Sequence, residues 1–236
     1  MHSLPPGTSA PLQAANAYVA QNTDAYRVAV QSQSWQRSGL APLLASLVED
    51  IAQITSYHEN FLGALADIEK LRETEVDTTV SNCLNRLLYV NVITALETYL
   101  SDAFINTVVP HPTLMRRFIE TTPAFQTEKI AISEVFKAME EIEGKAKGYL
   151  IDVVWHHLER VKPMYSATLE VEFPSDVGDI FRAIRIRHDI VHRNGKTKDG
   201  VEISITKEGI ETLIATVREY VQKIDKQLAQ VRSAAE

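Results

Sequence analysis

The residues best suited to chemistry lie in one short segment, Arg187-His188-Asp189-Ile190-Val191-His192. An arginine guanidinium stays charged and presents a planar fork of donors that fits phosphoryl oxygens. A histidine imidazole can take and return a proton near neutral pH. Both functions are needed to cut RNA without a metal, when a 2′-OH attacks the adjacent phosphorus and leaves a 2′,3′-cyclic phosphate and a 5′-OH. We therefore take Arg187 and His192 as the candidate catalytic pair.

The segment closes a predicted helix that runs from Val177 to about Arg193. Arg187 and His188 fall on the same stripe of this helix as its apolar residues. A charged side chain at a core-facing position costs free energy unless it is paired. The pattern therefore predicts that an acid from a neighbouring helix holds Arg187, or that the stripe becomes a cleft or a subunit interface there. The apolar members of the stripe are Val177, Ile180, Phe181, Ile184 and Val191.

The spacing of the catalytic pair leaves alternatives open. Positions i and i+5 are about 140° apart on an ideal helix, so Arg187 and His192 do not stack on one face. The reach of the arginine or a distorted helix end has to bring them together. Arg185 with His192, and Arg182 with His188, are alternative pairs at slightly longer spacing.

The charge of the chain is distributed unevenly. The whole chain has a net charge of −7, but between Arg182 and Lys198 six Lys/Arg accompany one acid, so this window carries +5 and the remainder −12. A local basic patch on an acidic body indicates an anion site, the alternative being a solvated basic helix end. The residues predicted to contact RNA are Arg185, Arg193, Asn194, Lys196 and Lys198.

Three further residues are candidates for supporting roles. Glu97 is a charge within the longest apolar helix, and we expect it to pair with Arg187 and orient it; the alternative is a solvated helix residue. His188 either contacts RNA or packs. Asp189 can pair with Arg185 or Arg193 one turn away, which stabilises a helix by only a few tenths of a kcal/mol.

The elements around this segment predict an all-α protein, an antiparallel helical bundle with a short β excursion after the motif helix. Residues 1–39 are Ala-, Gln- and Ser-rich and are interpreted as an N-terminal helical arm, partly flexible, and 40–236 as one helical domain. Apolar periodicity and proline positions predict the helices. They cover residues 40–72, about 80–109, a short helix between 112 and 122, 124–162, 177–193, and a last helix from about 206, with a connector over 163–174.

The β excursion is predicted from turn residues and alternation. Asn194-Gly195 tolerates positive φ and ends the motif helix, and Asp199-Gly200 is a second turn. The alternation of Val201, Ile203 and Ile205 with polar residues then predicts a short strand. At the other end of the motif helix, Ser175 or Asp176 is expected to act as the N-cap.

Several classes of site are not expected. The chain has no glycine-rich phosphate loop. The adjacent histidines of Trp155-His156-His157 point to different helix faces and have no third ligand at useful spacing, so we expect no metal and no cofactor. The single cysteine, Cys83, is expected to be a buried small hydrophobe, and a lone thiol fits a reducing compartment. With neither a secretory signal nor a bilayer-length apolar stretch, we expect a cytoplasmic protein with no membrane contact.

The string from Arg187 to Gly195, at the end of a helix in an all-α bundle, resembles the Arg-x4-His motif of HEPN-domain ribonucleases. The long helix containing Ala95-Leu96-Glu97-Thr98-Tyr99-Leu100-Ser101-Asp102 resembles the HEPN families of toxin–antitoxin and phage-defence systems. The resemblance covers about residues 78–230. Some HEPN toxins carry a tyrosine that a partner enzyme modifies two residues after the motif histidine, and this chain has Asn194 there.

The resemblance implies a metal-independent endoribonuclease that acts as a toxin or phage-defence effector. It also implies a homodimer in which two motifs face each other in a composite active site. A cognate antitoxin or defence-system protein is then an expected partner besides RNA. The alternative is a HEPN-like module that binds RNA or a protein without cutting, such as an antitoxin or a scaffold.

Overall fold

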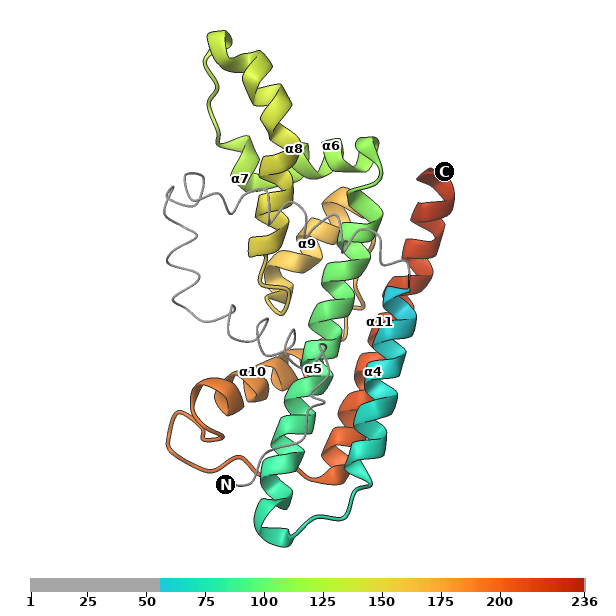
Figure 1. The fold of residues 1–236 in the computed structure, drawn as a ribbon, viewed down its shortest axis with the longest axis vertical. Coiled ribbons are helices and arrows are strands. Elements are labelled where there is room, and N and C mark those ends of the chain that lie inside the picture. The colour runs from blue at the N-terminus through green and yellow to red at the C-terminus, as the bar shows by residue number, and fades with distance from the viewer. Residues whose placement is uncertain (1–55, 236) are drawn as a thin grey trace, which may run out of the picture.

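The computed structural model describes residues 56–235, and this part of the chain is built from helices (Figure 1). The arm predicted for residues 1–39, and residues 40–55 of the helix predicted to follow it, lie outside the described residues. The elements are α4 (Tyr57–Arg72), α5 (Thr78–Val108), α6 (Pro112–Thr121), α7 (Pro123–Gln126), the 3-10 turn η2 (Ile132–Glu134), α8 (Val135–Asp152), α9 (Leu158–Leu169), α10 (Gly178–His192) and α11 (Lys207–Ala235). No helix among the described residues is both long and apolar enough to cross a bilayer.

Helix α5 is the central element, and α4 and α11 run alongside it (Figure 1). The Asp77 carboxylate caps its start by accepting a hydrogen bond from the Thr79 amide at 2.8 Å. Its end falls just before Pro110, as the sequence predicts. Residues 99–105 are all buried, so this part of α5 is covered on every side rather than amphipathic. Cys83, nearer its start, is exposed, so the prediction of a buried cysteine is wrong.

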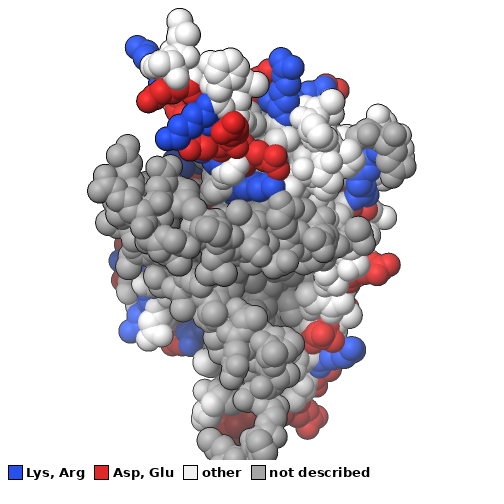
Figure 2. All heavy atoms as spheres, turned by 45° about the horizontal axis from the view of Figure 1, so that its top comes forward, with Lys and Arg blue, Asp and Glu red and all other residues white. Residues whose placement is uncertain are grey.

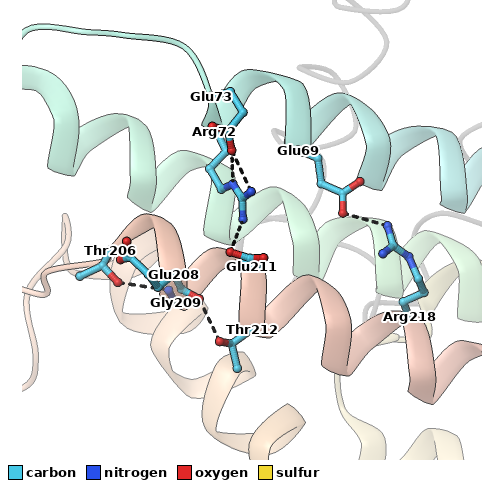
Figure 3. Close-up of polar contacts among 9 residues, drawn as sticks. All are labelled: Glu69, Arg72, Glu73, Thr206, Glu208, Gly209, Glu211, Thr212 and Arg218. Carbon is cyan, nitrogen blue, oxygen red and sulfur yellow. Dashed lines mark hydrogen bonds and ion pairs between the residues drawn. The ribbon is translucent and has the colours of Figure 1, made fainter.

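Helices α4 and α11 are joined by ion pairs across their outer surface (Figure 3). Arg72 Nη1 lies 3.1 Å from Glu211 Oε2, and Arg218 Nη2 lies 3.0 Å from Glu69 Oε1. The Gly209 amide donates to Thr206 Oγ1 at 3.1 Å, which caps α11 where the sequence predicts its start. Exposed ion pairs contribute at most about 1 kcal/mol each. The buried stripe of α11 therefore stabilises the packing more; it consists of Ile210, Leu213, Ile214, Val217, Val221, Ile224 and Leu228.

Helices α6 to α9 form the other part of the bundle, and here the predicted boundaries are partly wrong. The helix predicted over 124–162 is divided into α7, η2, α8 and the start of α9, and the predicted connector at 163–174 begins only after Leu169. Pro163 lies inside α9, where its ring removes one backbone hydrogen bond. Burial of Tyr165, whose hydroxyl donates to the Leu100 carbonyl at 2.5 Å, offsets that loss.

The surface around α8 mixes both signs of charge, as Figure 2 shows for the end of the molecule at which α8 lies. The pairs are local: Lys147 Nζ lies 2.7 Å from Glu143 Oε1, and Lys145 Nζ lies 3.2 Å from Glu128 Oε2. Neighbouring charges of opposite sign on this surface therefore partly offset each other.

The short β excursion predicted after the motif helix does not form a strand within residues 56–235. An isolated antiparallel bridge joins Lys196 to Glu202, and the chain then runs past α5. There, Asn82 Oδ1 accepts a hydrogen bond from the backbone amide of Ile205 at 3.1 Å. The buried side-chain amide of Asn85 donates to the backbone carbonyl of Ile205 at 2.8 Å. Side chains of α5 therefore bond this backbone in place of a partner strand.

Candidate functional site

Helix α10 carries the Arg187–His192 segment and packs against α5 and α11. It begins at Gly178 with Val177 as the N-cap and no side-chain capping bond, so the predicted Ser175 or Asp176 cap is wrong. Ile180 and Ala183 are its buried residues, and Val191 near its end is 45% exposed. The apolar stripe thus packs in the first half of the helix and reaches solvent at the motif.

Arg187 points from α10 toward α5, where it meets Glu97. Nη2 of Arg187 lies 3.6 Å from Glu97 Oε1, and both side chains are only 16% exposed. An acid from a neighbouring helix therefore faces the arginine on the stripe. At this distance the contact is an ion pair rather than a short bidentate hydrogen bond, so the guanidinium keeps donors for another oxygen.

His156 is a site residue that sequence reasoning missed. It lies in the segment between α8 and α9, and its Nδ1 is 3.2 Å from Glu97 Oε1. The sequence offered the adjacent histidines 156 and 157 only as metal ligands, and nothing in their spacing pointed to Glu97. No group of three or more His, Cys, Asp or Glu in residues 56–235 is arranged to hold a metal ion.

His188 and His192 form a pair on the exposed side of α10. Their ring centroids are 4.5 Å apart and the rings are tilted by 41°. Both residues are exposed. They are four positions apart and therefore lie next to each other on the helix surface. Arg187 lies on the inner side of the same turn. The structure therefore places His188 beside the predicted catalytic His192, at the exposed end of the helix that also carries Arg187.

The residues predicted to contact RNA extend from this helix end into the following turn. Arg185, Arg193, Asn194, Lys196 and Lys198 are all exposed. Arg193, the residue that follows α10, has its Nη1 3.3 Å from Asp189 Oδ1, so Asp189 pairs with Arg193 one turn away. The predicted positive φ values are confirmed, at 51° for Asn194 and 77° for Gly195.

The turn after α10 is held against α5 through Arg86. Its Nη1 lies 3.2 Å from Glu202 Oε1, and its side chain is 19% exposed. The Arg86 guanidinium also lies directly over Gly195: a Cβ at that glycine would be 2.8 Å from Arg86 Cζ. Gly195 is therefore favoured by its positive φ, and its lack of a Cβ leaves room for the Arg86 guanidinium.

We expect Gly195→Ala to destabilise the protein by about 2 kcal/mol, because it adds displacement of Arg86 to the strain of a positive φ. Gly200→Ala is the matched control, since Gly200 has φ 82° and a Cβ at that position would have no atom within 4 Å. The control should lose only about 1 kcal/mol. Urea unfolding of both variants measures the difference; equal losses would show that the contact with Arg86 contributes nothing.

The comparisons with known proteins place the chain in a family. The profile of the family described as RiboL-PSP-HEPN matches residues 49–230. No curated protein and no solved structure was found to match the chain. The match covers most of the chain, including α4, α5 and α10 with its Arg-x4-His segment. The chain therefore belongs to the HEPN family described as RiboL-PSP-HEPN.

Proposed function

We propose that this protein is a metal-independent endoribonuclease that cleaves RNA by attack of a 2′-OH on the adjacent phosphorus. The observation that carries the proposal is the exposed His188–His192 ring pair, centroids 4.5 Å apart, on the same helix end as Arg187. The cationic side chains of Arg193, Lys196 and Lys198 follow it at once and supply phosphate contacts.

Each residue has a role that its chemistry supports. His192 takes the proton of the 2′-OH as that oxygen attacks, and its neighbour His188 is placed to hold RNA or to return a proton to the leaving 5′-oxygen. Arg187 stabilises the added negative charge on the phosphoryl oxygens. Glu97 orients Arg187 through the 3.6 Å ion pair. The P–O5′ bond breaks as the P–O2′ bond forms, which yields the cyclic phosphate.

The decisive experiment incubates the purified full chain with diverse RNAs in EDTA. Cleavage with 2′,3′-cyclic phosphate and 5′-OH ends is the expected result. Cleavage that appears only after a divalent ion is restored would contradict metal independence.

A second candidate function is RNA or protein binding without cleavage, as in an antitoxin or scaffold. The observation in its favour is that Arg187 is mostly buried and already faces Glu97. An RNA that binds tightly, and stays intact with and without divalent ions, would favour this candidate.

Variants of Lys196 and Lys198, in the turn after α10, distinguish an effect on RNA binding from an effect on cleavage. Each phosphate contact to a single strand adds about −0.7 to the slope of log affinity against log salt. The double variant Lys196→Ala/Lys198→Ala should therefore bind RNA more weakly and with a flatter salt dependence, while single-turnover cleavage at saturating RNA survives. Affinity measured across salt concentrations tests this; wild-type affinity in the double variant would show that this turn is not the RNA path.

A symmetric homodimer that brings two α10 ends together is part of the proposal, supported by the exposed Val191 beside the motif. If one centre uses the arginine of one protomer and the histidine of the other, Arg187→Ala and His192→Ala proteins are each inactive. Mixed and allowed to exchange, they should regain about a quarter of wild-type activity. No regain, with exchange verified by mass-tagged protomers, would contradict a composite site.

The biological role we propose is a toxin or phage-defence effector, restrained by a cognate antitoxin or another protein of its system. The family assignment supports this role. Induced expression should arrest growth of a bacterial host, and the His192→Ala variant should not. Growth unaffected by an active enzyme would argue against the toxin role.

A further inference from the structure

The Glu97 carboxylate lies between two nitrogen-bearing side chains that come from different parts of the chain. His156 approaches it from the segment between α8 and α9, with Nδ1 at 3.2 Å from Oε1, and Arg187 approaches from α10, with Nη2 at 3.6 Å from the same oxygen. The side chain of His156 is 21% exposed and those of the other two 16%. Contact through a single carboxylate oxygen links the α8–α9 segment to the motif helix.

The segment that carries His156 is anchored firmly. Its neighbour Trp155 is buried, with its ring centroid 5.9 Å from that of Phe104 on α5, and Leu158 is fully buried at the start of α9. His156 therefore projects toward Glu97 from a backbone whose flanking side chains, Trp155 and Leu158, are buried in the core.

Three polar atoms of this cluster are buried without an aligned hydrogen bond: Oε1 of Glu97, Nδ1 of His156 and Nε of Arg187. A buried polar atom left unsatisfied costs about 1–3 kcal/mol. Nδ1 carries a hydrogen in the imidazolium and in one neutral tautomer. A small rotation of the His156 ring would align this hydrogen with Glu97 and satisfy two of the three atoms.

We propose that His156 is a positioning residue of the ribonuclease site: it donates from Nδ1 to Glu97 and thereby holds the Glu97 carboxylate against Arg187. The inference rests on the proposed function. A glutamate side chain loses rotamer freedom when it is fixed, and a second partner on a rigid segment supplies that restraint. Because His156 takes part of the hydrogen bonding of Glu97, Arg187 keeps donors for a phosphoryl oxygen.

The first test compares two amides at position 156. Asparagine places its amide near the position of Nδ1, whereas glutamine places it near Nε2. We expect His156→Ala and His156→Gln to lower kcat about tenfold with the KM for RNA changed by less than about twofold. His156→Asn should recover most of kcat. Equal rates for the two amide variants, or a wild-type rate for His156→Ala, would overturn the proposal.

His157→Phe is the matched control: it keeps a ring edge-on to that of His156, whose centroid is 4.9 Å away, and removes Nδ1, which faces Glu159 at 4.0 Å. It should cut RNA as the wild type does. Thermal midpoints of all variants are measured alongside, and His156→Asn and His156→Gln provide the comparison if the alanine variant unfolds. A control as slow as His156→Ala would mean that the whole segment, rather than His156, matters.

A double-mutant cycle shows whether His156 acts through Glu97. If it does, His156→Ala in a Glu97→Ala background should lower kcat no further. Additive losses would show that His156 acts independently of Glu97 and would overturn the proposal.

A readout that needs no activity separates this inference from the proposed function. The Nε–H resonance of Arg187, assigned by its loss in Arg187→Lys, should be observable in the wild type and broadened in His156→Ala, but recovered in His156→Asn. If the wild type cuts no RNA and the resonance behaves in this way, the proposed function fails and the positioning role stands. A resonance unchanged in His156→Ala overturns the positioning role.

Discussion

Replacement of His192 by alanine is expected to lower single-turnover RNA cleavage by roughly 10²- to 10⁴-fold, the range that a positioned acid–base group contributes. RNA affinity should be largely kept, because His192 is one exposed side chain on a surface with several cations. Arg187→Ala should lower the same rate by roughly 10²- to 10³-fold, since it removes donors for the developing phosphoryl charge. Quenched-flow cleavage at saturating enzyme measures both.

Two controls address the alternative pairs at this helix end. Arg182 is exposed, with Nη1 2.6 Å from Asp179 Oδ1, and Arg185 is exposed. Arg182→Ala should leave the cleavage rate unchanged, and Arg185→Ala should change only affinity. If Arg185→Ala loses cleavage and Arg187→Ala does not, the catalytic arginine is Arg185. Wild-type rates for both Arg187→Ala and His192→Ala, at matched thermal midpoints, would refute the site.

Asp102→Asn is expected to stabilise the protein above neutral pH. Asp102 is 9% exposed within α5, and burial raises the pKa of its carboxyl from 3.8 to about 7. The folded state therefore holds its proton more tightly than the unfolded state. The resulting stability is fully present below pH 4 and is lost as the pH rises through about 7, a difference on the order of 4 kcal/mol at most. Asparagine cannot ionise and avoids this loss.

Urea unfolding of the wild type and Asp102→Asn between pH 4 and pH 8 measures the effect, with the variant gaining relative to the wild type as pH rises. Asp77 offers a control of opposite sign. Hydrogen bonds from the Thr79 hydroxyl and amide lower the pKa of its exposed carboxyl. The stability that the ionised Asp77 carboxylate contributes is present at neutral pH and is lost as the pH falls. Asp77→Asn should therefore be less stable than the wild type at neutral pH. If the difference in unfolding free energy between the wild type and Asp102→Asn did not change with pH, the raised pKa of Asp102 would be contradicted.

The sequence alone determined the elements whose signals are local. The long helix α5 and the last helix α11 carry sustained apolar periodicity, and α6 is bracketed by prolines, so their existence and approximate ends could be predicted. The positive φ values at Asn194 and Gly195 follow from the sterics of those residue types. The motif helix was found in the same way, and the cost of an unpaired charge on its stripe pointed to an acidic partner for Arg187.

Only the tertiary structure decided which groups meet. Glu97 is one of many acids in the chain, and its 3.6 Å approach to Arg187 depends on how α10 crosses α5. His156 has no local signal, because its contact with Glu97 joins the α8–α9 segment to a helix far from it in the sequence. The strand predicted after α10 does not form for the same reason, a contact between distant parts of the chain: the side chains of Asn82 and Asn85 on α5 hydrogen-bond that backbone. Periodicity reports which face of a helix is apolar, whereas the neighbour that covers it is chosen by packing of the whole chain.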